Sequence, residues 1–373
     1  MEMSRRLVIL ASLLVVALFA AACETEETAD PGADPVDDPD GDEEAVDDDV
    51  EEVEEEELTD VPDDAELVIY GALHEEEIDR IASAFEDATG VPTETIRASA
   101  GEMTARIEAE GDNPDGDVFL GGPSETHEPL VPDFLRAYES PVAVEDYDED
   151  HYHSEHYWHG FYIGALGVAI NTERWEDEFG DDPYPETWDD LLDEQYEGAL
   201  AIAEPASSGT SYNMLVTQVF RLGEDEAFDW YEEFDRTVGQ YTSSGAAPAR
   251  MAGAGEFTLA VTFGHDILTP IQAGFPLELV YPEDTGFEIG AVSIIDDGPN
   301  PEAAEVFVDW MLGPEANQLH TDLSLRVPLR DDVELPGAAD PVDELDLVDG
   351  FDAEWAGEQR DHLLDEWEER VGG

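Results

Sequence analysis

The chain contains a single cysteine, Cys23, among its 373 residues. No disulfide can form within the chain, so a packed core alone must stabilise any folded domain. The cysteine ends a stretch typical of a secretory signal, with Arg5 and Arg6, an apolar run over residues 7–19, and three alanines. The apolar run is shorter than the roughly 18 residues that a membrane span needs, so we expect a cleaved signal at residues 1–23 and not a retained helix.

The position of Cys23 resembles the cleavage junction of a bacterial lipoprotein signal, in which the cysteine is acylated and becomes the first mature residue. Ala20 departs from that pattern, which usually has leucine three residues before the cysteine. The resemblance implies a protein outside the cytoplasm, anchored to the outer face of the cell membrane by a lipid on Cys23. The alternative is a plain secreted protein with an ordinary cleavage site near this cysteine.

Acidic residues outnumber basic ones by 97 to 14, and all 14 basic residues are arginine because the chain has no lysine. Residues 24–66 hold 24 of the acidic residues, no basic residue and four prolines. We expect residues 24–65 to form an acidic, disordered linker, since they bury too little apolar surface to fold. Removing those 24 and the one acidic residue of the signal leaves 72 acidic residues against 12 arginines.

This remaining charge constrains the environment of the folded part. Self-repulsion destabilises a compact state unless salt screens it, so we infer a halophilic protein that faces concentrated salt. The charge also argues against nucleic acid as a partner.

The part of the chain after Glu66 alternates between strand and helix patterns and is long enough for two domains. The alternation indicates an α/β fold with mainly parallel sheets. One helix pattern ends at Gly90, and another begins at Asn300 and Pro301. Strands are expected at 67–72, 91–97, 118–120, 165–170, 200–203, 258–263, 277–281 and 291–295.

Six segments between about residues 66 and 330 stand in an order that identifies a family. They are VIYGALHEEEIDRIASAFEDATGV, SAGEMTARIEAEGDNPDGDVFLGG, EPASSGTSY, AGAGEFTLAVTFGHD, YPEDTGFEIGAVSII and NPEAAEVFVDWMLGPEANQ. Their order resembles the solute-binding proteins of ABC importers, in the branch that binds ferric iron and phosphorylated or phosphonate solutes.

The resemblance implies a two-lobe, type II periplasmic-binding-protein-like α/β fold with a hinge and a ligand cleft between the lobes. It places lobe 1 at 66–165 plus 286–320 and lobe 2 at 166–285 plus 321–373, with crossings near 164–171 and 281–290. It also implies a monomer without enzymatic activity or cofactor, which captures a small solute and delivers it to the transmembrane subunits of a permease.

Loops after the strands are the expected places for a ligand, because open α/β sheets bind ligands beyond the carboxyl ends of their strands. The run Ser207 to Ser211 precedes an apolar helix, and its hydroxyls and free backbone N–H groups suit an anion such as phosphate, carboxylate or phosphonate. A plain helix cap is the alternative.

Arg97, Arg106 and Arg250 are scarce cations that could assist in binding the anion. The candidate ligand-binding residues are His74, Ser99, Gly101, Gly122, Ser207, Ser208, Gly209, Thr210, His265 and Asp266.

Ferric iron is the alternative ligand. The resemblance implies an iron site made by a histidine in the first loop, a carboxylate after the third strand and two adjacent tyrosines. His74 occupies the first position, but Gly122 stands at the carboxylate position and Gly264 with His265 at the tyrosine pair. Glycine offers no side-chain ligand and imidazole is a softer donor than phenolate, so the sequence favours an organic anion, with His265 and Asp266 binding its hydroxyl groups.

A histidine cluster, His151, His153, His156 and His159, is the weaker candidate for a metal site, because clustered histidines can bind zinc. It supports a remote alternative, an exported zinc-dependent hydrolase. The chain has neither a nucleophile elbow with a triad nor a His-Glu-x-x-His motif. An acidic surface adhesin is a third class of function that the sequence leaves open.

Glu283 and Asp284 are expected to form a turn at the rim of the cleft.

The first prediction concerns salt. Because the surface carries a large unscreened negative charge, the melting temperature should rise steeply between about 0.1 and 2 M KCl or NaCl, beyond the salt range in which simple Debye screening is complete. A melting curve that does not respond to salt would contradict the halophilic interpretation.

The second prediction concerns the anchor. Cys23→Ala should release the protein from the cell surface without changing its melting temperature, because the linker separates Cys23 from the folded part. Fractionation of cells followed by immunodetection measures the release, and a variant that stays in the membrane fraction would contradict lipid anchoring through this cysteine.

Overall fold

The computed structural model describes residues 61–62 and 65–372. The predicted signal with Cys23, and all but three residues of the predicted linker, lie outside the described residues. Within the described part, no helix is long and apolar enough to cross a membrane.

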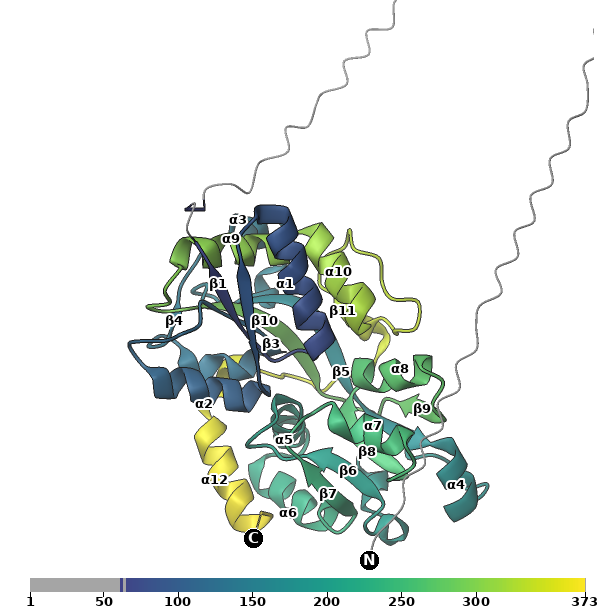
Figure 1. Cartoon of the computed structure of the whole chain (residues 1–373). Coiled ribbons are helices and arrows are strands. Elements are labelled where there is room, and N and C mark those ends of the chain that lie inside the picture. Colours follow the sequence, from purple (N-terminus) through teal and green to yellow (C-terminus); the bar gives the residue numbers. More distant parts are fainter. Residues whose placement is uncertain (1–60, 63–64, 373) are drawn as a thin grey trace, which may run out of the picture. The chain divides into compact units, whose positions relative to one another are not determined.

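A mixed sheet runs through the described part of the chain in the order β2-β1-β3-β10-β5-β8-β6-β7 (Figure 1). We call the part built on β1 to β4 and β10 the first lobe and the part built on β6 to β9 the second lobe. The strands of the path are β1 Leu67–Gly71, β2 Thr93–Arg97, β3 Val118–Pro123, β5 His159–Asn171, β6 Leu200–Ala203, β7 Val238–Thr242, β8 Leu259–Phe263 and β10 Phe287–Ile295. Three short strands join its sides, namely β4 Leu135–Arg136 on β10, and β9 Leu277–Val280 and β11 Val327–Pro328 on β5.

Strand β5 belongs to both lobes. Its first half, up to Ala165, pairs with β10, while its second half, from Leu166, pairs with β8 and β9. The expected crossing at 164–171 contains this change of partner. The lobe boundaries drawn from the sequence stay a prediction.

The direction of the central strands differs from the prediction of mainly parallel sheets. The outer pairs β1–β2, β1–β3, β6–β7 and β6–β8 are parallel. Strands β5 and β10 run antiparallel to each other and to their neighbours β3 and β8. They connect the lobes directly, without the crossover helix that makes neighbouring strands parallel, so local periodicity did not indicate their direction.

Twelve α-helices lie in the described residues. The sequence predicted the end of α1 correctly, since Gly90 adopts the left-handed conformation with φ of 77°. The start of α9 at Pro301 is also as expected. The helices are α1 Glu75–Thr89, α2 Ala100–Glu110, α3 Pro141–Asp146, α4 Thr172–Glu178, α5 Gly209–Leu222, α6 Glu224–Phe234, α7 Ala247–Gly253, α8 Gly264–Gln272, α9 Pro301–Leu312, α10 Pro314–Ser324, α11 Ala353–Glu358 and α12 Arg360–Arg370.

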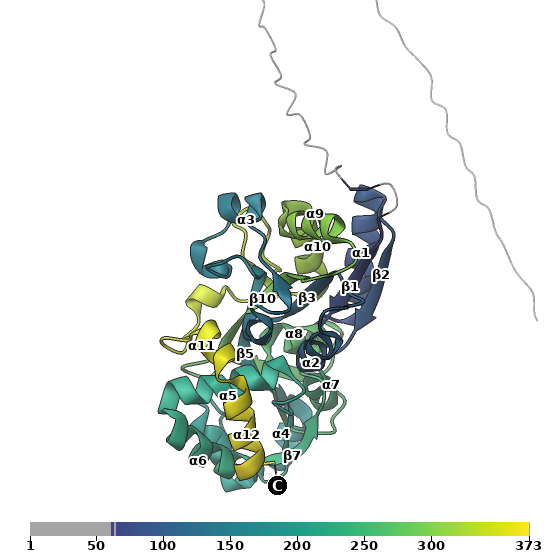
Figure 2. The ribbon, with the colours of Figure 1, turned by 90° about the vertical axis from the view of Figure 1, so that its left-hand side faces the viewer.

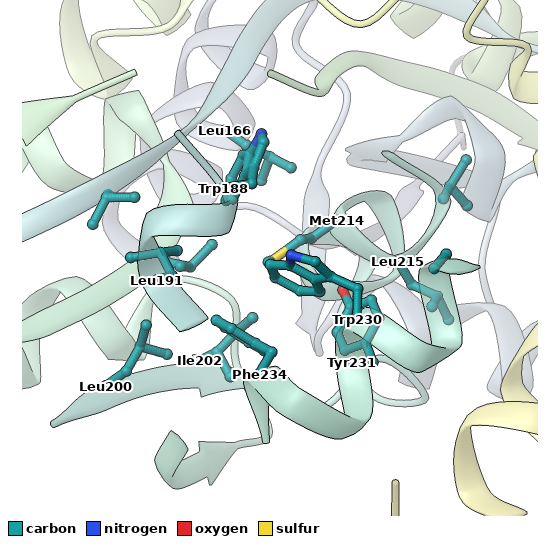
Figure 3. Close-up of a cluster of buried hydrophobic side chains, with 14 of the residues drawn as sticks. Leu166, Trp188, Leu191, Leu200, Ile202, Met214, Leu215, Trp230, Tyr231 and Phe234 are labelled. Carbon is teal, nitrogen blue, oxygen red and sulfur yellow. The ribbon is translucent and has the colours of Figure 1, made fainter. Parts of the chain in front are cut away.

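Each lobe has its own apolar core. In the second lobe, side chains of β5, β6 and β8 pack against α5 and α6, with Trp188, Met214 and Trp230 among the buried residues (Figure 3). In the first lobe, α1 and α9 pack with β1, β3 and β10 around Phe85 and Phe307. Because the chain has one cysteine, burial of these apolar surfaces supplies the main stabilisation.

The C-terminal segment contacts both lobes. Helix α11 packs on two 3-10 turns of the first lobe, Ser124–Thr126 and Glu128–Leu130, while α12 packs on α6 of the second lobe (Figure 2). Leu363 and Trp367 of α12 are buried in the second core. This segment therefore connects the lobes along a second route, separate from β5 and β10.

A buried ion pair holds α1 to the end of α10. Nη1 of Arg326 lies 3.0 and 2.9 Å from the two carboxylate oxygens of Glu77, and Nε2 of His320 lies 2.9 Å from Oε1. Burial alone would raise the pKa of Glu77, but the charge of Arg326 and the contact with His320 lower it from 4.5 to about 2. The pair is therefore ionised at neutral pH.

The third prediction tests this pair. Glu77→Gln should lower the free energy of unfolding by about 3 kcal/mol, because it leaves the buried Arg326 charge without its partner. The stabilisation by the wild-type carboxylate is present above pH 4.5, the ordinary pKa, and should be lost as the pH falls towards 2. Denaturant unfolding at constant salt measures both effects.

Glu76→Gln is the matched control, since Glu76 is the exposed neighbour on the same helix. It should change the free energy of unfolding by no more than about 0.5 kcal/mol. If the two substitutions lowered the free energy of unfolding equally, the effect would come from the change in net charge and not from the contact between Glu77 and Arg326.

Candidate ligand-binding cleft

A cleft of about 490 Å³, its open mouth included, lies where the strand ends of the two lobes meet. The space that it encloses is about 60 Å³, smaller than the roughly 300–1,000 Å³ of common small-molecule sites, so a solute of that size requires the lobes to open further. The lining residues are Ala72, Leu73, His74, Arg97, Ser99, Ala100, Gly122, Pro123, Tyr162, Ser208, Gly209, Thr210, Ser244, Gly245, Ala246, Phe263, His265, Asp266, Glu288 and Arg326.

Five helices begin at this cleft. The residues that precede their first turns are His74 for α1, Ser99 for α2, Ser208 for α5, Ala246 for the short helix α7 and Phe263 for α8, and all five line the cleft. The first N–H groups of a helix have no partner within the helix and carry a partial positive charge. The convergence of these starts makes the cleft suitable for an anion.

The start of α5 is the least neutralised among the longer helices at the cleft. Helices α1, α2 and α8 each have an acidic residue in the first turn, whereas α5 and the seven-residue α7 have none. The Ser208 side chain also makes no capping hydrogen bond to α5. The plain helix cap that the sequence left open is therefore not formed by Ser208, and the N–H groups near Gly209 and Thr210 keep their positive potential.

Arg97 adds a full positive charge to the cleft. Its Nε donates a hydrogen bond of 2.8 Å to the carbonyl oxygen of Leu73, which leaves the two terminal nitrogens directed elsewhere. Among the described residues, Arg97 forms no salt bridge, although eight other arginines do. A guanidinium that lines the cleft without a carboxylate partner suits a ligand anion, which it can bind through two hydrogen bonds.

A hydrogen bond crosses the cleft between the lobes. Nε2 of His74 lies 2.8 Å from Oδ1 of Asp266, and Thr262 donates from its hydroxyl to Oδ2 at 3.2 Å. Burial alone would raise the pKa of Asp266, but His265 and the hydrogen bond with His74 hold it below its ordinary value. Asp266 is therefore a carboxylate that can accept hydrogen bonds from ligand hydroxyls.

Two more buried groups lie beside Asp266. Nε2 of His265 is 3.7 Å from a carboxyl oxygen of Glu288 and 3.9 Å from Asp266. Burial, with the nearby Arg326 charge, lowers the pKa of His265 well below its ordinary value, and burial raises that of Glu288 well above its own. His265 is therefore neutral at neutral pH and can donate and accept hydrogen bonds, while burial favours the protonated form of Glu288, which can also donate.

Several cleft residues were not found from the sequence, among them Ser244, Gly245 and Ala246 after β7. Tyr162 and Glu288 lie on the crossing strands, and the Arg326 guanidinium lies 4.8 Å over the Tyr162 ring. Nothing in the local pattern of these two strands indicates a ligand site, because their side chains reach the cleft only through the pairing of β5 with β10.

Eight of the ten predicted ligand-binding residues line the cleft, and two do not. Gly101 and Ser207 face each other across the seam between the lobes, where a Cβ on Gly101 would lie 2.7 Å from the carbonyl oxygen of Ala206 and 3.2 Å from Ser207. Of the cations that could assist, Arg97 lines the cleft while Arg106 pairs with Glu110 and Arg250 lies outside it. The eight in the lining are His74, Ser99, Gly122, Ser208, Gly209, Thr210, His265 and Asp266.

The four histidines of the predicted cluster, His151, His153, His156 and His159, lie among aromatic side chains. Nδ1 of His153 accepts the backbone N–H of Glu155 at 2.9 Å, so neutral His153 carries its proton on Nε2. His156 stacks on Tyr152, and burial lowers the pKa of His159 to about 3. Within the described residues, no group of three or more histidine, cysteine or acidic side chains has the geometry to hold a metal ion.

The cleft lacks the phenolate pair of an iron site. Its single tyrosine, Tyr162, is buried, and burial raises its pKa well above the ordinary value. A Cβ on Gly264 would lie 2.2 Å from the hydroxyl oxygen of Tyr281, so no larger side chain fits at that position. The turn at Glu283 and Asp284 lies outside the cleft lining.

Known proteins resemble this chain in sequence and in structure. Residues 130–358 match the family described as bacterial extracellular solute-binding protein. An uncharacterized protein of Haemophilus influenzae is 37% identical over 317 residues, which cover 82% of this chain and 90% of the relative.

Two solved structures extend the comparison. The periplasmic binding protein AfuA from Actinobacillus pleuropneumoniae, with exogenous fructose-6-phosphate bound, has a TM-score of 0.80 at 34% identity over 83% of this chain and 99% of that chain. Iron-bound HitA from Pseudomonas aeruginosa has a TM-score of 0.71 at 20% identity, over 81% and 99% of the two chains, and shows a likeness of fold alone. The predicted two-lobe α/β fold is thereby confirmed.

Proposed function

The chain belongs to the bacterial extracellular solute-binding proteins, the solute-binding components of ABC importers, and we propose that its solute is a small phosphorylated sugar. One observation carries the proposal. The unneutralised start of α5 and Arg97, which has no carboxylate partner, line the same cleft. A phosphate group bound between them would receive backbone and guanidinium hydrogen bonds from both lobes.

The opposite part of the lining suits the sugar. Asp266 accepts hydrogen bonds, neutral His265 can both donate and accept, and Glu288 can donate when it is protonated. This combination fits neighbouring hydroxyl groups. AfuA, with fructose-6-phosphate bound, is a relative with sufficient identity for its ligand to support the proposal. Ferric iron is disfavoured because the cleft offers one protonated tyrosine in place of two phenolates.

The proposal extends to the whole protein. Closure of the lobes around the solute is the working motion, without a catalytic step or a cofactor, and the closed form is recognised by permease subunits at the outer face of the membrane. The protein acts as a monomer held there by the lipid on Cys23.

The fourth prediction tests the anion end. In 2 M KCl, fructose 6-phosphate should raise the melting temperature of the wild type, because a ligand that binds only the folded state stabilises it. Arg97→Met and the double variant Ser208→Ala, Thr210→Ala should each lose about 1.5–3 kcal/mol of binding free energy per charge-assisted hydrogen bond removed. Calorimetric titration at constant salt measures these losses.

Arg80→Met is the matched control for Arg97→Met. Arg80 is likewise exposed and without a salt bridge, but it does not line the cleft, so its removal should leave the affinity unchanged. Fructose, inorganic phosphate, 2-aminoethylphosphonate and ferric citrate complete the screen. A shift by ferric salt alone, with a coloured complex, would contradict the proposal and favour an iron site at His74 and His265.

A further inference from the structure

Arg360, the first residue of α12, is buried without a carboxylate partner. Its exposed fraction is 6%, and among the described arginines without a salt bridge it alone is buried, since Arg80, Arg97 and Arg250 are exposed. Its Nη1 is buried and has no hydrogen-bond partner. An uncompensated buried charge costs several kcal/mol, so its presence in a chain rich in carboxylates calls for a reason.

The position of Arg360 supplies that reason. Its Nη2 donates to the carbonyl oxygen of Ala206 at 3.3 Å, and its guanidinium lies 4.5 Å over the ring of Tyr212. The same Nη2 would lie 3.0 Å from a Cβ on Gly101. Arg360 thus contacts the loop before α5 and lies beside the first turn of α2, two segments that also contain the cleft residues Ser208 and Ser99.

The charged groups that face Arg360 do not neutralise it by contact. They are Glu125 of the 3-10 turn Ser124–Thr126, Glu108 of α2 and Asp361 of α12, with the Tyr212 hydroxyl of α5. Oε1 of Glu125 accepts a hydrogen bond of 2.7 Å from Asn213, while Oε2 is buried and without a partner. Burial raises the pKa of Glu125 to about 7, so this carboxyl is only partly ionised at neutral pH.

We propose that Arg360 is a positioning residue of the anion end: it holds the starts of α2 and α5 together from behind, and its uncompensated charge attracts the phosphate of the solute. The inference rests on the proposed function. It gives the C-terminal segment a part in ligand selection, because a residue outside the cleft lining would set the preference for a doubly charged ligand.

The fifth prediction uses two ligands of the same shape and different charge, fructose 6-phosphate and fructose 6-sulfate. At pH 8 the phosphate carries about two negative charges and the sulfate one. Arg360→Gln retains a donor for the Ala206 carbonyl but removes the charge. It should weaken sulfate binding about threefold and phosphate binding about tenfold, because a Coulomb contribution to the binding free energy doubles with ligand charge. Arg360→Lys should restore the preference for phosphate.

Two further variants make the test independent of stability. Arg370→Met removes an arginine of the same helix that pairs with Asp229 and Glu232, and it should leave both affinities unchanged. Glu125→Gln removes the nearest opposing charge and should shift the preference the other way, towards phosphate. This second variant tests the proposal even where Arg360→Gln does not fold.

The outcomes are distinct. Equal loss of both ligands in Arg360→Gln, or no shift of preference in Glu125→Gln, would show that Arg360 has a packing role only and would overturn the inference while the proposed function stands. A wild-type protein that binds neither ester would overturn the proposed function and this inference together.

Discussion

The spacing of the cleft depends on strand β5, which is shared by the two lobes. One half of this strand pairs with β10 and the other with β8, so the backbone hydrogen bonds of a single segment fix where both lobes present their strand ends. The cross-cleft hydrogen bond between His74 and Asp266 can form only when those ends face each other. Backbone pairing therefore determines the geometry of the cleft, and it also fixes the positions of side chains on the paired strands, such as Tyr162 and Glu288.

Positive and negative charges are distributed unevenly over the two lobes. The surface is strongly acidic, yet three of the few arginines lie in or directly behind the cleft. Arg326 is neutralised by Glu77, whereas Arg97 and Arg360 have no carboxylate in contact. In a protein that repels anions over most of its surface, this local positive region is where the proposed phosphorylated solute would place its phosphate, and salt would reduce the long-range repulsion that such a solute meets.

The sequence predicted the features that local rules control. Strand positions, the helix stop at Gly90 and the hydroxyl-rich start of α5 were readable because turn and cap residues act over a few positions. The starts of β5 and β10 were wrong, since these strands begin at His159 and Phe287 and not at 165 and 291. The directions of β5 and β10, and the contribution of Arg326, were not readable, because they depend on pairing between segments far apart in the chain. Gly101 and Ser207 belong to segments that were correctly predicted to reach the cleft, but these two residues face each other between the lobes. Only the relative placement of the two lobes reveals this contact. The predictions on Cys23 and on individual ligand contacts stay untested.

The route of the C-terminal segment has a consequence for how the protein folds. The hydroxyl of Tyr212 donates to the carbonyl of Ala356, residues 144 positions apart, and Trp367 completes the second core. Contacts of such high sequence separation slow folding because a long loop must close before they form. The second lobe cannot complete the burial of its core beside α6 until α12 has arrived. During export the nascent lobe would therefore expose aggregation-prone surface for longest, and the repulsion between its many carboxylates would be what keeps such intermediates apart.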